Sequence, residues 1–286
     1  MRVYFERGFQ SLFYLGLTLL LCLVCPVLAW GQSMNSRANH AHYISVKVPG
    51  STSTVPFSIN DFGAVTGYYY SATVRLGGFI RDRDGWITTF EFPGAGETEP
   101  IAINANGEVT GYWTAANTYT PPWQGFVRSR WGVFSSISVP GSTSVWPMRI
   151  NASGTVIGYY STASDYGIPF YGFVRSPNGV VTTFNSPGAV DTVFNDINDA
   201  GVILGYFYNG VSDTFFTLSQ GDLTPINVPG GPESINQEGA IAGFSSGQQG
   251  YVRSRHGELT LFPIPGAIEN DGEYLSINNL GTVMGG

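Results

Sequence analysis

Cysteine is almost absent from this sequence of 286 residues. The two cysteines, Cys22 and Cys25, both lie in an apolar segment near the N-terminus. The rest of the chain therefore contains no residue that could form a disulfide or a thiolate metal site. A cysteine-free body behind an apolar leader is consistent with an exported bacterial protein.

Charge is also scarce, and positive charge is the scarcer. Charged residues make up 12% of the chain, Lys and Arg number 13 against 20 Asp and Glu, and Lys47 is the only lysine. Binding to a phosphate backbone or to an anionic membrane surface requires basic patches. The formal net charge of −7 therefore argues against nucleic acid as a partner.

Histidine is too rare, and too badly placed, for the common catalytic sites. His40 and His42 fall in the linker expected after the apolar segment, and His256 lies at a turn. A Ser-His-Asp triad or a histidine metal centre needs such residues next to partners that are missing here. We expect no catalytic residue, no metal and no other cofactor. A pair of carboxylates stays open as an alternative, because glycosidases need only two and they can be distant in sequence.

The N-terminus has the pattern of a secretion signal. Arg2 and Arg7 precede an apolar run from Leu12 to Leu28, and small residues allow cleavage after Ala29 or Gly31. The alternative is an uncleaved anchor, because the run is close to the length that spans a bilayer. We expect a signal peptide at 1–31, a linker at 32–42 and a repeat domain at 43–286. The mature protein is then secreted or held in the bacterial cell envelope, with no membrane span.

One pattern returns six times after this leader. Its head is Ile-Asn-x-x-Gly-x-(Val/Ile)-x-Gly, its middle is usually Gly-Phe-(Val/Ile)-Arg, and its tail is an apolar run that ends in Pro-Gly. Successive Pro-Gly pairs lie 36 to 47 residues apart, close to the length of a four-stranded propeller blade. The heads begin at Ile59, Ile103, Ile150, Ile197, Ile235 and Ile277.

Each repeat predicts four short strands joined by tight turns. Asn and Gly favour a turn after the first strand, and proline ends the fourth because it cannot donate a ladder hydrogen bond. No segment after the leader has helical periodicity, so the sheets are expected to be antiparallel. We predict an all-β fold, a β-propeller of about six four-stranded antiparallel blades; a β-solenoid is the alternative. The last blade is expected to be incomplete and composite, with residues 43–48 completing it, because the chain stops after that blade's second strand.

The Ile-Asn-x-x-Gly-x-Val-x-Gly-Tyr head and the aromatic third strand resemble the bacterial HAF family of probable extracellular repeats. The resemblance covers the chain from Tyr43 to the C-terminus. The His-Ala-Phe triplet that names the family is replaced here by Gly-Phe-Val or Gly-Phe-Ile. The resemblance implies an exported protein and assigns no biochemical activity.

The loops between second and third strands vary in length, whereas the Asn-x-x-Gly turns are nearly uniform. Variable loops on a rigid scaffold commonly carry binding residues. The two longest loops belong to adjacent repeats, and we predict that their aromatics form one exposed ligand-binding patch. The alternative is that they fill a crevice between two blades. These residues are Tyr119, Trp123, Tyr166, Phe170 and Tyr171.

Together these features favour a monomeric, non-catalytic binding or scaffold module for an extracellular glycan or protein, and not an enzyme. The alternative is an extracellular polysaccharide-active propeller hydrolase. An enzyme should break the repeat symmetry with acidic residues at the central channel. At the residue before Ile-Asn, only Arg149 and Asp196 are charged, and we expect them to pair with each other.

Overall fold

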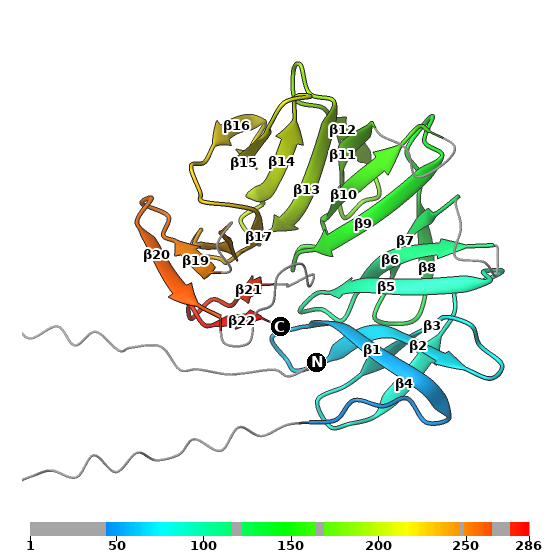
Figure 1. Cartoon of the computed structure of the whole chain (residues 1–286). Coiled ribbons are helices and arrows are strands. Elements are labelled where there is room, and N and C mark those ends of the chain that lie inside the picture. The colour runs from blue at the N-terminus through cyan, green and yellow to red at the C-terminus, as the bar shows by residue number, and fades with distance from the viewer. Residues whose placement is uncertain (1–43, 116–121, 164–168, 246–248, 265–274, 286) are drawn as a thin grey trace, which may run out of the picture.

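The computed structural model describes residues 44–115, 122–163, 169–245, 249–264 and 275–285. They form an all-β propeller of five four-stranded antiparallel blades and a partial sixth sheet (Figure 1). The predicted fold class is confirmed. The expected signal peptide and linker lie outside the described residues. Within the described residues, no helix is long and apolar enough to cross a membrane.

The blades follow one another along the chain, and each sheet has its strands in sequence order. The first blade contains β1 (Ser51–Ile59), β2 (Val65–Ser71), β3 (Gly77–Arg81) and β4 (Ile87–Phe90). The second contains β5 (Glu97–Ile103), β6 (Val109–Thr114), β7 (Gln124–Arg128) and β8 (Phe134–Ile137). The third contains β9 (Ser144–Ile150), β10 (Val156–Ser161), β11 (Phe170–Arg175) and β12 (Val181–Phe184). The fourth contains β13 (Asp191–Ile197), β14 (Ile203–Tyr208), β15 (Asp213–Ser219) and β16 (Asp222–Pro225). The fifth contains β17 (Pro232–Ile235), β18 (Ile241–Phe244), β19 (Gln249–Arg253) and β20 (Leu259–Pro263), and the sixth sheet contains β21 (Leu275–Ile277) and β22 (Val283–Gly285).

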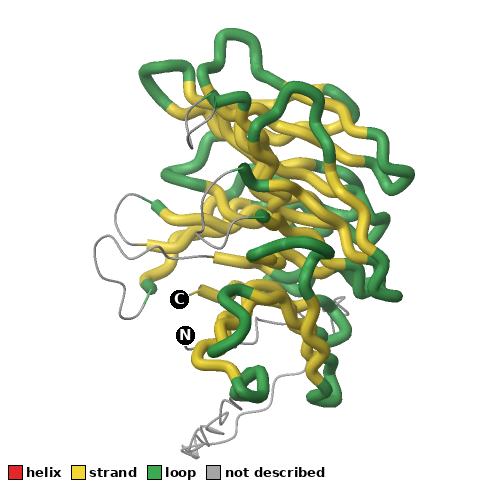
Figure 2. The backbone as a smooth tube through the Cα atoms, turned by 90° about the vertical axis from the view of Figure 1, so that its right-hand side faces the viewer, coloured by secondary structure: helices red, strands yellow, loops and turns green. Residues whose placement is uncertain are grey.

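The first strand of each blade contacts the first strand of the next, so β1, β5, β9, β13, β17 and β21 surround the axis. Figure 2 shows the blades in profile as a stack of strands, with turns and loops at both ends. Apolar side chains fill the spaces between blades. Between the second and third blades, Ile137 and Val139 pack with Phe173 in one buried cluster.

The sixth sheet is incomplete, as expected from the sequence. Val46 and Val48 pack against Phe79 of the first blade, just as Val139 packs against Phe173. The segment 44–48 therefore takes the place of a fourth strand beside the first blade. It forms no strand in the structure, so β21 and β22 remain a two-stranded sheet.

The recurring asparagine closes its own turn and links neighbouring blades. In the third blade, Oδ1 of Asn151 accepts the backbone N–H of Thr155 at 3.0 Å, and its Nδ2 donates to the carbonyl of Asn198 at 3.2 Å. The same inter-blade bond runs from Asn60, Asn104, Asn198 and Asn236 to the asparagine of the following repeat. The asparagines thus form a belt that spans all six repeats, which accounts for their recurrence without a ligand.

The first glycine of each head has a positive φ, as the turn requires. The φ angles lie between 77° and 83° for Gly63, Gly107, Gly154, Gly201, Gly239 and Gly281. A β-branched residue is strained in this conformation. We expect Gly201→Val to destabilise the protein by about 1–3 kcal/mol through backbone strain alone, because no atom lies within 4 Å of its added Cβ. Thermal melts that match the wild type would contradict this role of the turn.

In the five complete blades, the second glycine of the head lies opposite a β-bulge in the first strand. In the third blade, Gly158 pairs with Pro147, and the register shifts between Ile157 and Gly158. A Cβ on Gly158 would lie 2.1 Å from the carbonyl oxygen of Trp146. The bulge therefore brings two backbones so close together that only glycine fits.

Candidate functional site

Three of the five residues of the predicted aromatic patch lie within the described part of the chain. Tyr119 and Tyr166 lie outside the described residues. Trp123 is 2% exposed, stacks edge-on against Tyr112 at 5.2 Å, and its backbone N–H donates to Oγ of Ser144. Its side chain is therefore buried against the second blade and is not presented to solvent, while its backbone joins the second blade to the third.

The other two patch residues are partly buried at the start of β11. Phe170 packs against Trp146 and Tyr159, with ring centroids 5.8 and 5.3 Å apart, and Tyr171 lies 5.3 Å from Tyr160. All of these contacts are between strands of the third blade. Ligand binding by the five aromatics stays a prediction.

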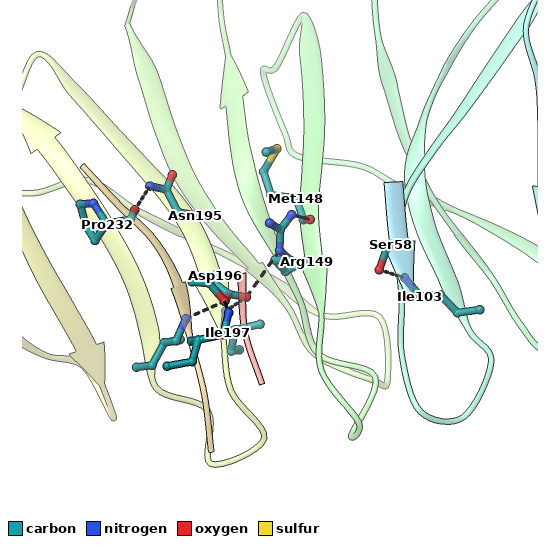
Figure 3. A network of polar contacts seen from close by, with 11 residues as sticks. Ser58, Ile103, Met148, Arg149, Asn195, Asp196, Ile197 and Pro232 are labelled. Atoms are coloured by element: carbon teal, nitrogen blue, oxygen red, sulfur yellow. Dashed lines mark hydrogen bonds and ion pairs between the residues drawn. The ribbon is translucent and has the colours of Figure 1, made fainter. Parts of the chain in front are cut away.

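Charge at the channel is concentrated in the third, fourth and fifth blades. Arg149 is on β9 and Asp196 is on β13, and Nε of Arg149 lies 3.5 Å from Oδ1 of Asp196 (Figure 3). The expected pairing of these two residues is confirmed. The Arg149 side chain is 37% exposed and also donates from Nη1 to the carbonyl of Met148 at 2.9 Å. Its guanidinium is thus held by the carboxylate of Asp196 and the carbonyl of Met148, while part of the side chain stays exposed to solvent.

Asp196 is 8% exposed and fully occupied by protein partners. Oδ1 accepts the backbone N–H of Ile197 at 2.9 Å, and Oδ2 accepts that of Ile235 in the next blade at 2.8 Å. In other blades, Ser58 and Ser234 accept the equivalent inter-blade N–H (Figure 3 shows the contact of Ser58). Burial raises the pKa of the Asp196 carboxyl, and Arg149 and the hydrogen bonds offset this only in part.

A second carboxylate, Glu233 on β17, completes the cluster. Glu233 is half-buried, and no described residue donates a hydrogen bond to its carboxylate. Burial raises the pKa of the Glu233 carboxyl, the nearby Asp196 raises it further, and Arg149 acts in the opposite direction. The negative charge of Glu233 also contributes to the raised pKa of Tyr251, which burial mainly causes. A half-buried carboxyl without a fixed partner is suited to gain or lose a proton during a reaction.

Charged channel residues were expected only directly before Ile-Asn, and Glu233 does not occupy that position in its repeat. Glu233 comes one residue earlier, where the register of β17 shifts between Pro232 and Ser234. The corresponding residue in the fourth blade is Asn195, whose Nδ2 donates to the carbonyl of Pro232 at 3.0 Å (Figure 3). The sequence contained one signal for Glu233, a charged residue at the bulge position in one repeat only.

No group of three His, Cys, Asp or Glu side chains that could hold a metal ion occurs among the residues that the structure describes. Two cavities lie away from the channel cluster. One, of about 500 Å³, lies at the variable-loop end of the first two blades, and a smaller one, of about 200 Å³, lies between the second and third blades.

No family model and no curated protein matches the chain. Among solved structures, the chain is similar to a catalytically inactive variant of virginiamycin B lyase from Staphylococcus aureus with quinupristin. That likeness has a TM-score of 0.51 at 18% identity and covers 78% of this chain and 74% of that one. A gluconolactonase from Xanthomonas campestris is similar with a TM-score of 0.48 at 12% identity, over 81% and 85% of the two chains. A mutant of AofleA from Arthrobotrys oligospora follows with 0.45 at 13%, over 80% and 77%.

The lyase structure supports the propeller fold. The expectation of a non-catalytic module without enzyme activity is wrong in so far as the structure that supports this fold is that of a named lyase. That expectation depended on finding no acidic couple at the channel, whereas Glu233 interacts electrostatically with both members of the Arg149–Asp196 pair.

Proposed function

We propose that this protein is a carbohydrate-active hydrolase that cleaves ester bonds, such as O-acyl groups on a polysaccharide, at the channel cluster. The observation that carries the proposal is the half-buried Glu233 carboxyl, whose pKa burial raises and which interacts electrostatically with the Arg149–Asp196 pair. Raising the pKa of a carboxyl group toward neutrality makes it a better general base. The carboxylate then binds a proton more strongly, and it is still present in its ionised form near the working pH.

In the proposed reaction, the Glu233 carboxylate accepts a proton from a water molecule while the water oxygen bonds to the ester carbonyl carbon. The carbonyl oxygen becomes an oxyanion, and Arg149 donates hydrogen bonds to it. When the carbonyl bond re-forms, the C–O bond to the sugar breaks and Glu233 returns its proton to the departing alkoxide. The products are a free carboxylic acid and the sugar hydroxyl. Donors aimed at a developing oxyanion typically contribute about 10²–10³ in rate.

Arg149 favours ester cleavage over glycosidic cleavage. A glycosidase transition state resembles an oxocarbenium ion and carries positive charge. A guanidinium close to the reacting carbon would repel that charge, whereas it stabilises the negative charge on a tetrahedral intermediate. The single cation of the cluster therefore decides between the two types of hydrolysis.

Asp196 is a positioning residue in this mechanism. It is too buried to reach a substrate, and it fixes Arg149 through their ion pair. Its negative charge also raises the pKa of Glu233. We expect Asp196→Asn to lower the pKa of Glu233, so the acidic limb of the pH–rate profile moves to lower pH while kcat falls. A variant with reduced kcat and an unmoved limb would show that Asp196 acts only on the fold.

We further propose an extracytoplasmic location, which supports a polysaccharide as the substrate. The proposal is supported by the basic and apolar leader around Arg2 and Arg7 and by the HAF-like repeat head. N-terminal sequencing of the protein recovered from culture medium or envelope should begin at Trp30 or Gln32. A protein retained in the cytoplasm with residue 1 intact would contradict it.

The experiment is an assay of the full chain on an acetylated xylan and on the same xylan after chemical deacetylation. We expect acetate to be released from the first without new reducing ends, and no product from the second. Glu238→Gln is the matched control for Glu233→Gln, since Glu238 is an exposed acid of the same blade as Glu233. New reducing ends without acetate would overturn ester cleavage in favour of glycosidic cleavage.

A further inference from the structure

A second charged couple breaks the repeat symmetry at the opposite end of the blades. At the boundary between the second and third blades, Ser144 accepts the backbone N–H of Trp123 at 3.1 Å. At the following boundary, Asp191 accepts that of Phe170 at 2.8 Å. These residues occupy the same place at the start of the first strand, and their role is to join adjacent blades.

Glu97 takes this place in the second blade, and it makes a different contact. Its Oε1 lies 2.5 Å from Nε of Arg75, whereas Pro122 and Pro169 correspond to Arg75 at the next two boundaries. Glu97 is 2% exposed, and its Oε2 is buried with no hydrogen-bond partner among the described residues. A carboxylate buried with one oxygen unpartnered is unfavourable for stability and needs a reason beyond the fold.

Arg75 extends from this buried carboxylate into the cavity of about 500 Å³. Its side chain is 55% exposed, and it lines the cavity together with Thr73, Glu91 and Gly96. Because Glu97 holds the guanidinium through Nε, the two Nη groups remain for a ligand. A guanidinium whose position is fixed by a buried partner pays little entropy to bind an oxyanion in its planar fork.

The cavity combines this donor fork with acceptors. Glu91 contributes a carboxylate and Thr73 a hydroxyl to the lining. A ligand with only negative charge would be repelled by Glu91. A ligand that carries both a carboxylate and hydroxyl groups satisfies Arg75 and Glu91 together, and the volume is within the range of small-molecule sites. From this geometry we infer that the cavity is a binding site for a sugar acid, such as a uronate residue of an acidic polysaccharide.

The test is calorimetric titration of the full chain with tri-galacturonate and with neutral galactotriose. Arg75→Gln alone could unfold the protein, because it leaves Glu97 buried without a charge partner. The double variant Arg75→Gln/Glu97→Gln removes both charges together and permits a neutral hydrogen bond, because the glutamine amide nitrogen takes the position of Nε of Arg75. We expect the wild type to bind the acidic trisaccharide at least about tenfold more tightly than the neutral one, as a charge-assisted contact predicts, and the double variant to lose this preference.

Two further variants separate this site from others. Arg83→Gln removes an exposed arginine of the same blade and should leave binding unchanged. Glu233→Gln should also bind tri-galacturonate normally, so failure of the hydrolase proposal would not affect this one. Equal binding of the two trisaccharides by the wild type, or an unchanged preference in a folded double variant, would overturn the inference.

Discussion

Replacing Glu233 with glutamine should lower kcat for ester hydrolysis by about 10²- to 10⁴-fold, the usual contribution of a general base. Glutamine keeps the shape of the side chain and cannot accept the proton of the attacking water. Because Glu233 receives no hydrogen bond from a described residue, its loss should not unfold the protein. The measurement is the rate of acetate release at saturating substrate.

The control for this prediction is Glu238→Gln, which changes the net charge of the same blade equally and should keep the wild-type rate. Circular dichroism melts of both variants should coincide with those of the wild type. If Glu233→Gln were folded and retained more than about a tenth of the activity, Glu233 would not be the base.

Gly158→Ala should be the most destabilising of the single substitutions considered. The added Cβ would lie 2.1 Å from the carbonyl oxygen of Trp146 and 2.9 Å from the ring of Phe173. Both neighbours are held in a strand pair and a buried inter-blade cluster, so neither can move away cheaply. We expect a loss of at least about 3 kcal/mol, the upper end of the usual effect of overpacking, measured by denaturant unfolding.

The matched control is Gly201→Ala, which also adds one methyl to a glycine of the head. Gly201 has a φ of 80° and no atom within 4 Å of the added Cβ, so only backbone strain of about 1 kcal/mol is expected. Equal losses for the two variants would show that conformational strain, and not the close approach of strands at the bulge, makes the second glycine necessary.

The fold was predictable because each repeat contains the residues that determine its strands and turns. Asn151 and Gly154 specify the turn, and their recurrence at the spacing of a blade specifies the propeller. The incomplete sixth sheet followed from the same count. What repetition cannot express is a position that differs in one copy only.

The cluster of Arg149, Asp196 and Glu233 is made of such positions. Arg149 and Asp196 could be predicted from the sequence because both directly precede Ile-Asn. Their pairing follows from their opposite charges on neighbouring first strands. Glu233 lies at a bulge, where one extra residue shifts the alternation of side chains, and no period-two pattern predicts its direction. The burial of Trp123 could not be predicted either, because the sequence does not distinguish an aromatic residue exposed in a loop from one that is buried.

The most direct test of the proposed function is the pH dependence of acetate release by the wild type and by Glu233→Gln. A general base acts as its carboxylate, so the rate should rise with pH as Glu233 ionises. Because the pKa of Glu233 is raised, the midpoint of the wild-type limb should lie above the ordinary glutamate value of 4.5. The residual rate of Glu233→Gln should lack this limb. A limb with the same midpoint in both proteins would contradict the assignment of Glu233 as the base.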